Sequence, residues 1–230
     1  MIKVLLLTGA NNHDWTRSAP FCKKMLEQTG MFQVDLVEAP SQALEDGEKL
    51  ASYQLLFVDY NGPDWSDAAK KNFVDAVRGG TGVCILHASD NAFTGWVEYE
   101  EICALLWRAG TGHGSYHKFD VKITDLDHPI TRSLPPVLKD HPDELYHKLV
   151  HMHDTPYHVI ATAYSSPESG GTGKDEPMLV VKEYGKGRVF HNILGHVWQG
   201  GGMESFENPE FQRVTIRGCE WAATGNVTIE

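Results

Sequence analysis

The chain has 230 residues, of which 41% are hydrophobic, and carries a formal net charge of −11 at pH 7. This length and composition predict a single domain over residues 1–230 with a core of ordinary size. The negative charge argues against nucleic acid and against an anionic membrane surface as partners, because both attract basic proteins. No apolar run approaches the ~20 residues of a membrane-spanning helix. The four cysteines form no CxxC pair, so we expect reduced thiols in a cytoplasmic protein.

The first ninety residues predict an open, mostly parallel sheet. Apolar runs separated by turn residues indicate four strands, at residues 2–8, 32–37, 54–60 and 82–86. A helical stripe follows the first strand, and Ser66 begins a second helix that ends near Gly79. The order is β-α-β-β-α-β, with a missing or irregular crossover between the second and third strands. Ligands of such sheets bind at the carboxyl ends of the strands.

The second half is richer in predicted strands. Residues 98–107 have a helical pattern, and Asn208 with Pro209 opens a last helix over 211–221. Strands are predicted at 119–123, 157–163, 178–184 and 188–194, the last two as a hairpin around Gly185. The Gly-rich loop 165–176 is either a mobile lid or a surface excursion.

Twelve histidines, several of them in loops beside Gly, Asp or Asn, are the unusual feature of the composition. In GVCILHASDN, residues 82–91, a buried strand enters a sharp turn with His87 at its apex. This shape resembles the elbow that displays a nucleophile in other α/β enzymes. Histidine at such an elbow is better suited to act as a general base, proton donor or metal ligand than as a nucleophile. The alternative is a strand-end histidine that only bonds the backbone.

Two glycine-containing loops add polar groups. GANNHDW, residues 9–15, lacks the dinucleotide-binding GxGxxG pattern, and its side chains suit hydroxyl groups. In GTGHGSYH, residues 110–117, the glycines let the backbone approach a ligand closely. His113 and His117 would share a face if this segment were a strand. A metal site, a sugar or proton-donor site and a purely structural turn all remain open for it.

Two further motifs follow in the second half. DELYH, residues 143–147, combines carboxylates, a phenol and an imidazole; it could orient a catalytic imidazole or simply begin an amphipathic strand. NILGHVW, residues 192–198, places His196 and Trp198 after a strand. Prolines or turns adjoin His128, His141 and His158, which we expect at the surface.

These motifs give three sets of candidate residues. The catalytic candidates are His87, His113, His147, Glu144 and His196. The substrate-binding candidates are Asn11, Asn12, His13, Asn61, Asn91, Tyr146 and Trp198. No cofactor is required by the sequence, but the histidine density is compatible with a divalent metal, zinc or manganese, on His87, His113 and His117.

Taken together the motifs resemble the ThuA-like, or trehalose-utilisation, family of bacteria. The resemblance runs nearly end to end and in the family's order, through LLLTGANNHDW, GVCILHASDNAF, GHGSYHKFDV, DHPIT, DELYH, EYGKGRVFHNILGH and NPEFQRVTIRGCEWAA. It implies a flavodoxin-like fold of the class I glutamine amidotransferase type, here with an extra hairpin in the C-terminal half. True amidotransferases carry Cys at the elbow, whereas this chain has His87 there and Cys84 inside the strand. Glutaminase chemistry is therefore not expected.

The resemblance implies a role in disaccharide metabolism, in the company of oxidoreductases that make 3-keto sugars. Our leading hypothesis is an enzyme that hydrolyses, eliminates or isomerises a 3-keto-glycoside, with a small sugar as its partner. The alternatives are a non-catalytic sugar-binding or regulatory protein, and a metal-dependent hydrolase of another small substrate. A homo-oligomer is compatible with all three.

Overall fold

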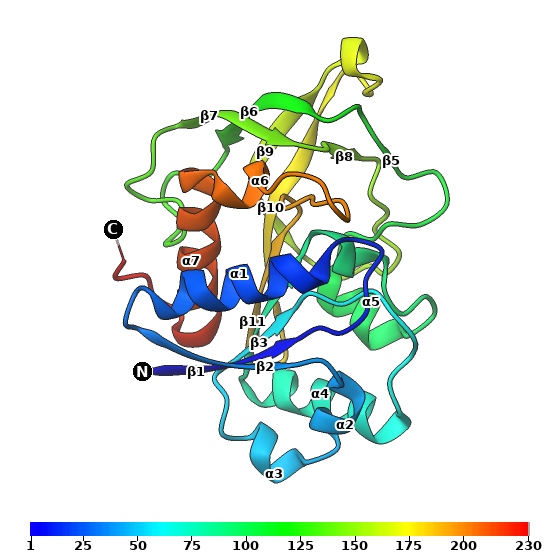
Figure 1. Cartoon of the computed structure of the whole chain (residues 1–230), viewed down its shortest axis with the longest axis vertical. Coiled ribbons are helices and arrows are strands. Elements are labelled where there is room, and N and C mark those ends of the chain that lie inside the picture. Colours follow the sequence, from blue (N-terminus) through cyan, green and yellow to red (C-terminus); the bar gives the residue numbers. More distant parts are fainter. Residues whose placement is uncertain (230) are drawn as a thin grey trace.

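A mixed sheet of nine strands, in the order β2-β1-β3-β4-β11-β10-β9-β6-β7, forms the centre of the computed structural model, which describes residues 1–229 (Figure 1). Its strands are β1 (Ile2–Leu7), β2 (Phe32–Val37), β3 (Leu55–Val58), β4 (Gly82–Leu86), β6 (His117–Ile123), β7 (Val137–Asp143), β9 (His158–Ser165), β10 (Lys174–Tyr184) and β11 (Gly187–Asn192). A separate antiparallel pair consists of β5 (Gly112–His113) and β8 (Tyr146–His147). The helices are α1 (Trp15–Glu27), α2 (Pro40–Leu44), α3 (Gly47–Leu50), α4 (Asp67–Gly79), α5 (Val97–Cys103), α6 (Glu204–Glu207) and α7 (Pro209–Thr224).

Five strands, β2-β1-β3-β4-β11, make the parallel half of the sheet. The chain order reverses at β1, which has β2 on one side and β3 on the other, as in flavodoxin-like sheets. This confirms the predicted fold class. The crossover between β2 and β3 consists of the short helices α2 and α3, which explains why no helical pattern was evident there. Because the five strands are parallel, their carboxyl ends lie at one edge of the sheet.

Helices cover both faces of this half, because β1, β3 and β4 are apolar on both sides. One core packs α1 and α7 against residues such as Leu6 and Phe57, and the other packs α4 and α5 against residues such as Leu7 and Val58. The Ser66 side chain accepts a hydrogen bond from the Ala69 amide, so the predicted cap begins α4. None of the helices in residues 1–229 has the length and apolar character that crossing a bilayer requires.

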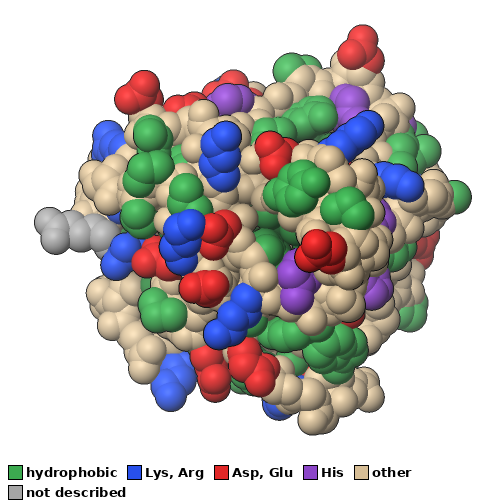
Figure 2. All heavy atoms as spheres, turned by 90° about the horizontal axis from the view of Figure 1, so that it is seen from above, with side chains coloured by type: hydrophobic (Ala, Val, Ile, Leu, Met, Phe, Trp, Pro, Cys, Tyr) green, Lys and Arg blue, Asp and Glu red, His purple; other side chains and the backbone are tan. Residues whose placement is uncertain are grey.

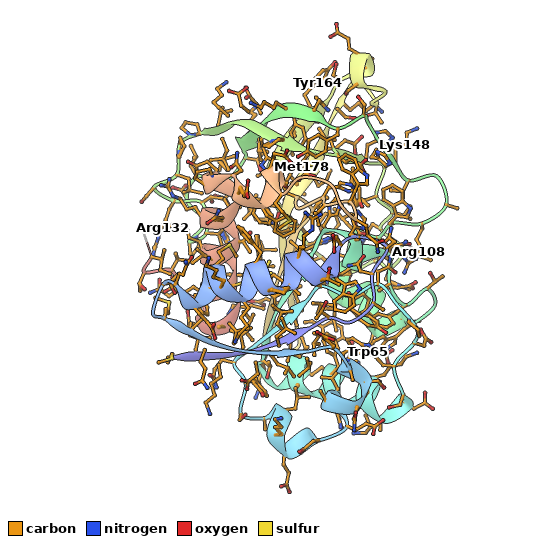
Figure 3. The ribbon with its side chains drawn as sticks, in the orientation of Figure 1. Trp65, Arg108, Arg132, Lys148, Tyr164 and Met178 are labelled. Atoms are coloured by element: carbon orange, nitrogen blue, oxygen red, sulfur yellow. The ribbon has the colours of Figure 1, made fainter. Side chains whose placement is uncertain are left out.

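The antiparallel half, β10-β9-β6-β7, extends the sheet beyond β11. The predicted hairpin is confirmed as the pairing of β10 with β11. The β9–β10 hairpin projects at the top of Figure 1, and Tyr164 lies near its end in Figure 3. The Gly-rich loop that connects β9 to β10 is attached to the segment before β6, because the Ser115 amide donates to the Ser169 carbonyl over 2.7 Å.

Candidate active site

Three histidines meet at the carboxyl edge of the parallel half. His13 follows β1, His87 follows β4 and His196 follows β11, and all three are buried. His13 Nε2 lies 2.8 Å from His196 Nδ1, and His87 Nε2 lies 3.3 Å from the same atom. The three nitrogens lie within 4.8 Å of one another. Residues from three distant parts of the chain therefore share one point.

Tight backbone turns aim these rings. His87 has a φ of 39°, a left-handed conformation that is strained for a residue with a side chain, and begins a 3-10 turn over His87–Asn91. The predicted sharp turn is therefore present. Gly195, with a φ of 118°, turns the chain before His196. The segment that carries His13 is joined to the segment that carries His196, because the Asp14 amide donates to the Val197 carbonyl over 3.1 Å.

The hydrogen bonds of two of the rings, His87 and His13, assign their tautomers. His87 Nδ1 is 2.6 Å from the Ile193 carbonyl, so it donates a proton and leaves a lone pair on Nε2. His13 Nδ1 is 3.2 Å from Asn12 Oδ1, which likewise leaves the lone pair on Nε2. Burial, together with the neighbouring imidazoles, lowers the pKa of His13 to about 2 and that of His196 to about 3. Burial also lowers the pKa of His87. The rings of His13 and His87 therefore each point an Nε2 lone pair at His196 Nδ1.

This arrangement fits a divalent metal. A tetrahedral zinc ion with bonds of about 2.0–2.1 Å holds its ligand atoms roughly 3.3 Å apart. Two of the three separations, 2.8 and 3.3 Å, are near that spacing, and the third is within 4.8 Å. Fixing the second ring nitrogen is also how proteins prepare histidine for a metal. Zinc suits an all-imidazole set better than manganese, which prefers oxygen ligands.

A polar cavity of about 370 Å³ opens beside the three histidines. It is lined by Asn12, His13, Ala88, Asn91, Trp107, His113, Glu144, Tyr146, His196 and Trp198. Figure 2, seen from above the view of Figure 1, shows most visible histidine side chains on one half of this surface, beside acidic and hydrophobic side chains. In Figure 3, Arg108 lies on the side of the strand ends and Arg132 on the opposite side, near α7.

Glu144 and Tyr146 face the histidines from the antiparallel half. Glu144 Oε2 is 3.2 Å from His196 Nδ1 and 3.4 Å from His113 Nδ1. The Tyr146 hydroxyl is 3.5 Å from His13 Nε2, and its ring stacks on His87 with centroids 4.1 Å apart. Burial raises the pKa of Glu144 and raises that of Tyr146 well above its usual value. The cavity thus contains a weakly acidic carboxyl group and a phenol that stays protonated.

Asp143, the neighbour of Glu144, is fully buried and has a structural role. Its carboxylate accepts hydrogen bonds from the Gly195 amide at 2.7 Å, the His196 amide at 3.0 Å and the Ser205 hydroxyl at 2.8 Å, and pairs with His141 at 2.9 Å. Burial alone would raise its pKa, but the hydrogen bonds with the His141 ring and the Gly195 amide hold the pKa of this carboxyl group well below its usual range. Asp143 therefore fixes the turn that presents His196. The expectation of a surface position for His141 was wrong, because its ring is buried against this carboxylate.

The structure gathers most of the candidate residues. His113, Glu144 and His196 line the cavity with Asn12, His13, Asn91, Tyr146 and Trp198, and His87 lies in the adjoining cluster.

Four candidate side chains lie outside both the cavity lining and the histidine cluster. His147 turns to Ser165 Oγ, 3.3 Å away. The side chain of Asn11 donates to Asp59 and that of Asn61 to Asn12 Oδ1, so both support the first loop. His117 contacts the Ser115 carbonyl. The expected metal set of His87, His113 and His117 therefore does not converge; His13 and His196 join His87 instead.

Trp107 and Ala88 line the cavity but were not among the candidates. The helical pattern over 98–107 concealed Trp107, because α5 in fact ends at Cys103, where Ala104 takes a φ of 67°. The residues after Cys103 then run as an irregular segment toward the cavity. Asp59, which accepts a hydrogen bond from the Asn11 side chain, was also not among the candidates. Its position directly after β3, at the carboxyl end of that strand, was the signal that could have identified it.

Comparisons with known proteins agree with this architecture. A ThuA-like protein from Parabacteroides merdae is 35% identical, with a TM-score of 0.89, over 100% of this chain and 92% of that one. A ThuA-like protein from Bacteroides uniformis is 16% identical, with a TM-score of 0.70, over 99% and 93%. The CTPS glutaminase domain of Trypanosoma brucei shares the fold, at 10% identity and a TM-score of 0.53 over 100% and 96%. No curated protein matches the chain.

The family model described as trehalose utilisation matches residues 3–222, which is nearly the whole chain. Together with the protein from Parabacteroides merdae, this match shows that the chain belongs to the ThuA family.

Proposed function

We propose that this protein is a metal-assisted lyase that removes the proton beside the carbonyl group of a 3-keto-glycoside and releases the group attached at C1. The observation that carries the proposal is a buried carboxyl group, Glu144, that faces three convergent imidazoles in a polar cavity. The family's description as trehalose utilisation supports a sugar substrate. We expect the protein to act in the cytoplasm on a small, uncharged sugar.

The carboxylates of the site favour elimination over ordinary glycoside hydrolysis. Glycosidases generally use two carboxyl groups, one on each side of the bond that breaks. Among the residues that line the cavity, Glu144 alone carries a carboxylate. Asp143 is turned away and is fully occupied by backbone amides, Ser205 and His141. One base is sufficient when a neighbouring carbonyl group makes the C–H bond acidic.

In the proposed step, Glu144 accepts the proton from C2 of the 3-keto sugar. The electron pair of that C–H bond forms the C1–C2 double bond, and the C1–O bond to the leaving group breaks. The leaving oxygen takes the proton that Glu144 has accepted from C2, so the carboxyl group acts first as the base and then as the acid. The products are an unsaturated keto sugar and a free hydroxyl compound, with no net oxidation.

Charge that develops on the C3 oxygen faces the Tyr146 hydroxyl, which can donate a hydrogen bond because its pKa is raised. A divalent ion on His13, His87 and His196 would supply Lewis-acid polarisation of the same carbonyl group. In this assignment His87 is a ligand rather than the base, because its free nitrogen points into the cluster. The Asn12 and Asn91 amides are available to the sugar hydroxyls, and Trp107 and Trp198 to its ring faces.

The test is incubation of the protein in D₂O with methyl 3-keto-glucoside, followed by NMR, with and without EDTA and added zinc. We expect loss of the C2 proton signal and an unsaturated product. Glu144→Gln should lower turnover by about 10²- to 10⁴-fold and retain zinc. Glu168→Gln, on the projecting hairpin, is the matched control and should behave like wild type. Release of 3-keto-glucose without exchange at C2 would indicate a hydrolase, and binding without any turnover would indicate a sugar-binding protein.

A further inference from the structure

A second cavity of the molecule has a volume of about 470 Å³. Its walls include Tyr116, Lys118, Asp140, Glu204, Glu207 and Asn208. The Tyr116 ring lies 5.0 Å from the ring of Trp198, and Trp198 in turn lies 4.3 Å from the ring of His196. Because Trp198 lines the first cavity and Tyr116 the second, the two cavities are neighbours across this aromatic pair.

Trp198 is exposed and Tyr116 is half-buried, and hydrogen bonds hold both residues in place. Trp198 is 44% exposed, which is unusual for the largest side chain. Its carbonyl accepts a hydrogen bond of 2.7 Å from Arg17, which also binds the Gly201 carbonyl and pairs with Asp14 at 2.7 Å. The Tyr116 hydroxyl donates to the Pro142 carbonyl over 3.2 Å. A fixed aromatic surface beside a polar cavity offers a flat apolar face at little entropic cost to a ligand ring.

The charged groups of the second cavity limit what can bind there. Within residues 1–229, Lys118, Glu204 and Glu207 form no ion pair with other side chains. Carboxylates accept hydrogen bonds from hydroxyl groups, and the lysine can donate one. Because the acidic groups outnumber the lysine, an anionic group such as a phosphate would be repelled. The cavity suits an uncharged ring that carries many hydroxyl groups.

We propose that the second cavity is the leaving-group subsite, which holds the second sugar ring of a disaccharide while the oxidised ring lies beside Glu144. This inference rests on the proposed function. It assigns Tyr116 to specificity: Tyr116 binds the departing ring and does not touch the reacting atoms. The enzyme therefore prefers a two-ring substrate to a glycoside whose leaving group is a methyl group.

The test compares kcat/KM for 3-keto-trehalose and for methyl 3-keto-glucoside. Wild type should prefer the two-ring substrate. Tyr116→Ala should lower kcat/KM for 3-keto-trehalose about tenfold, the value of one lost aromatic contact, and leave the methyl glycoside within about twofold. Tyr116→Phe keeps the ring and should restore the preference. Trehalose should compete better than trehalose 6-phosphate.

The outcomes separate the two proposals. Equal losses on both substrates, or no loss on either, would overturn the subsite and leave the lyase proposal intact. The same applies if wild type converts both substrates with equal kcat/KM. A wild-type protein that neither converts nor binds any of these sugars would overturn both proposals together.

Discussion

The two halves of the sheet contribute different chemistry to the site. The parallel half supplies His13, His87 and His196, each on a short turn directly after a strand. The antiparallel half, with the segments around β5 and β8, supplies His113, Glu144 and Tyr146. The first set converges on one point, and the second set lies across the cavity from it, with Glu144 and Tyr146 in contact with the histidines. We therefore expect that substitutions in the two halves change metal binding and substrate chemistry separately.

The largest expected effect is the loss of zinc binding when a histidine of the parallel half is removed. His196→Ala removes the atom that His13, His87 and Glu144 all approach, so the affinity for zinc should fall at least about 100-fold. Isothermal titration of EDTA-treated protein with zinc measures it. The matched control is His147→Ala, a buried histidine of the antiparallel half whose ring faces Ser165; its affinity should match wild type. An equal loss of zinc affinity in both variants would show that zinc binding does not depend on the parallel half alone.

The same division explains what the sequence could predict. Strand ends on a parallel sheet converge whatever the loop conformation, so His87, His196 and His13 could be named from apolar runs and the residues after them. In the antiparallel half, the facing of each side chain depends on register, and a shift of one residue reverses it. In β8, Tyr146 faces the cavity and His147 faces Ser165. DELYH alone does not determine which of the two points inward. Asp143 could not be assigned either, because its partners Gly195 and Ser205 are more than fifty residues away.

The next expected effect concerns the contact that joins the halves. In Asp143→Asn the amide group would face backbone amides that also donate, and one acceptor would be lost. We expect a loss of about 3 kcal/mol in the free energy of unfolding, as for other broken buried pairs, measured by urea denaturation. Zinc affinity should fall as well, since the turn that carries His196 loosens. Asp127→Asn, an exposed carboxylate, should change stability by less than about 0.5 kcal/mol. A stable Asp143→Asn protein with weakened zinc binding would separate the two roles.

The smallest expected effect lies within the parallel half, at Asp59. Burial raises the pKa of this carboxyl group to about 6, against hydrogen bonds from Ser18 at 2.6 Å and Asn11 at 3.1 Å. Because the folded pKa lies above the unfolded value, the contribution of the neutral acid is complete below about pH 4. This contribution is lost as the pH rises to about 6, and the free energy of unfolding then falls by roughly 3 kcal/mol.

Asp59→Asn stays neutral at every pH but keeps one acceptor oxygen, so it should weaken one of the two hydrogen bonds by about 1 kcal/mol. The variant should therefore be less stable than wild type by about 1 kcal/mol at pH 4, and more stable by roughly 1–2 kcal/mol at pH 7.5. Urea denaturation of EDTA-treated protein at both pH values measures the difference. The informative result is the reversal of sign, because a purely steric effect of the substitution would be the same at both pH values. Asn11 also accepts a hydrogen bond from the His13 amide, at 3.1 Å. If the stabilised variant binds zinc less tightly at pH 7.5, the ionised Asp59 costs stability in order to hold the His13 loop in its metal-binding conformation.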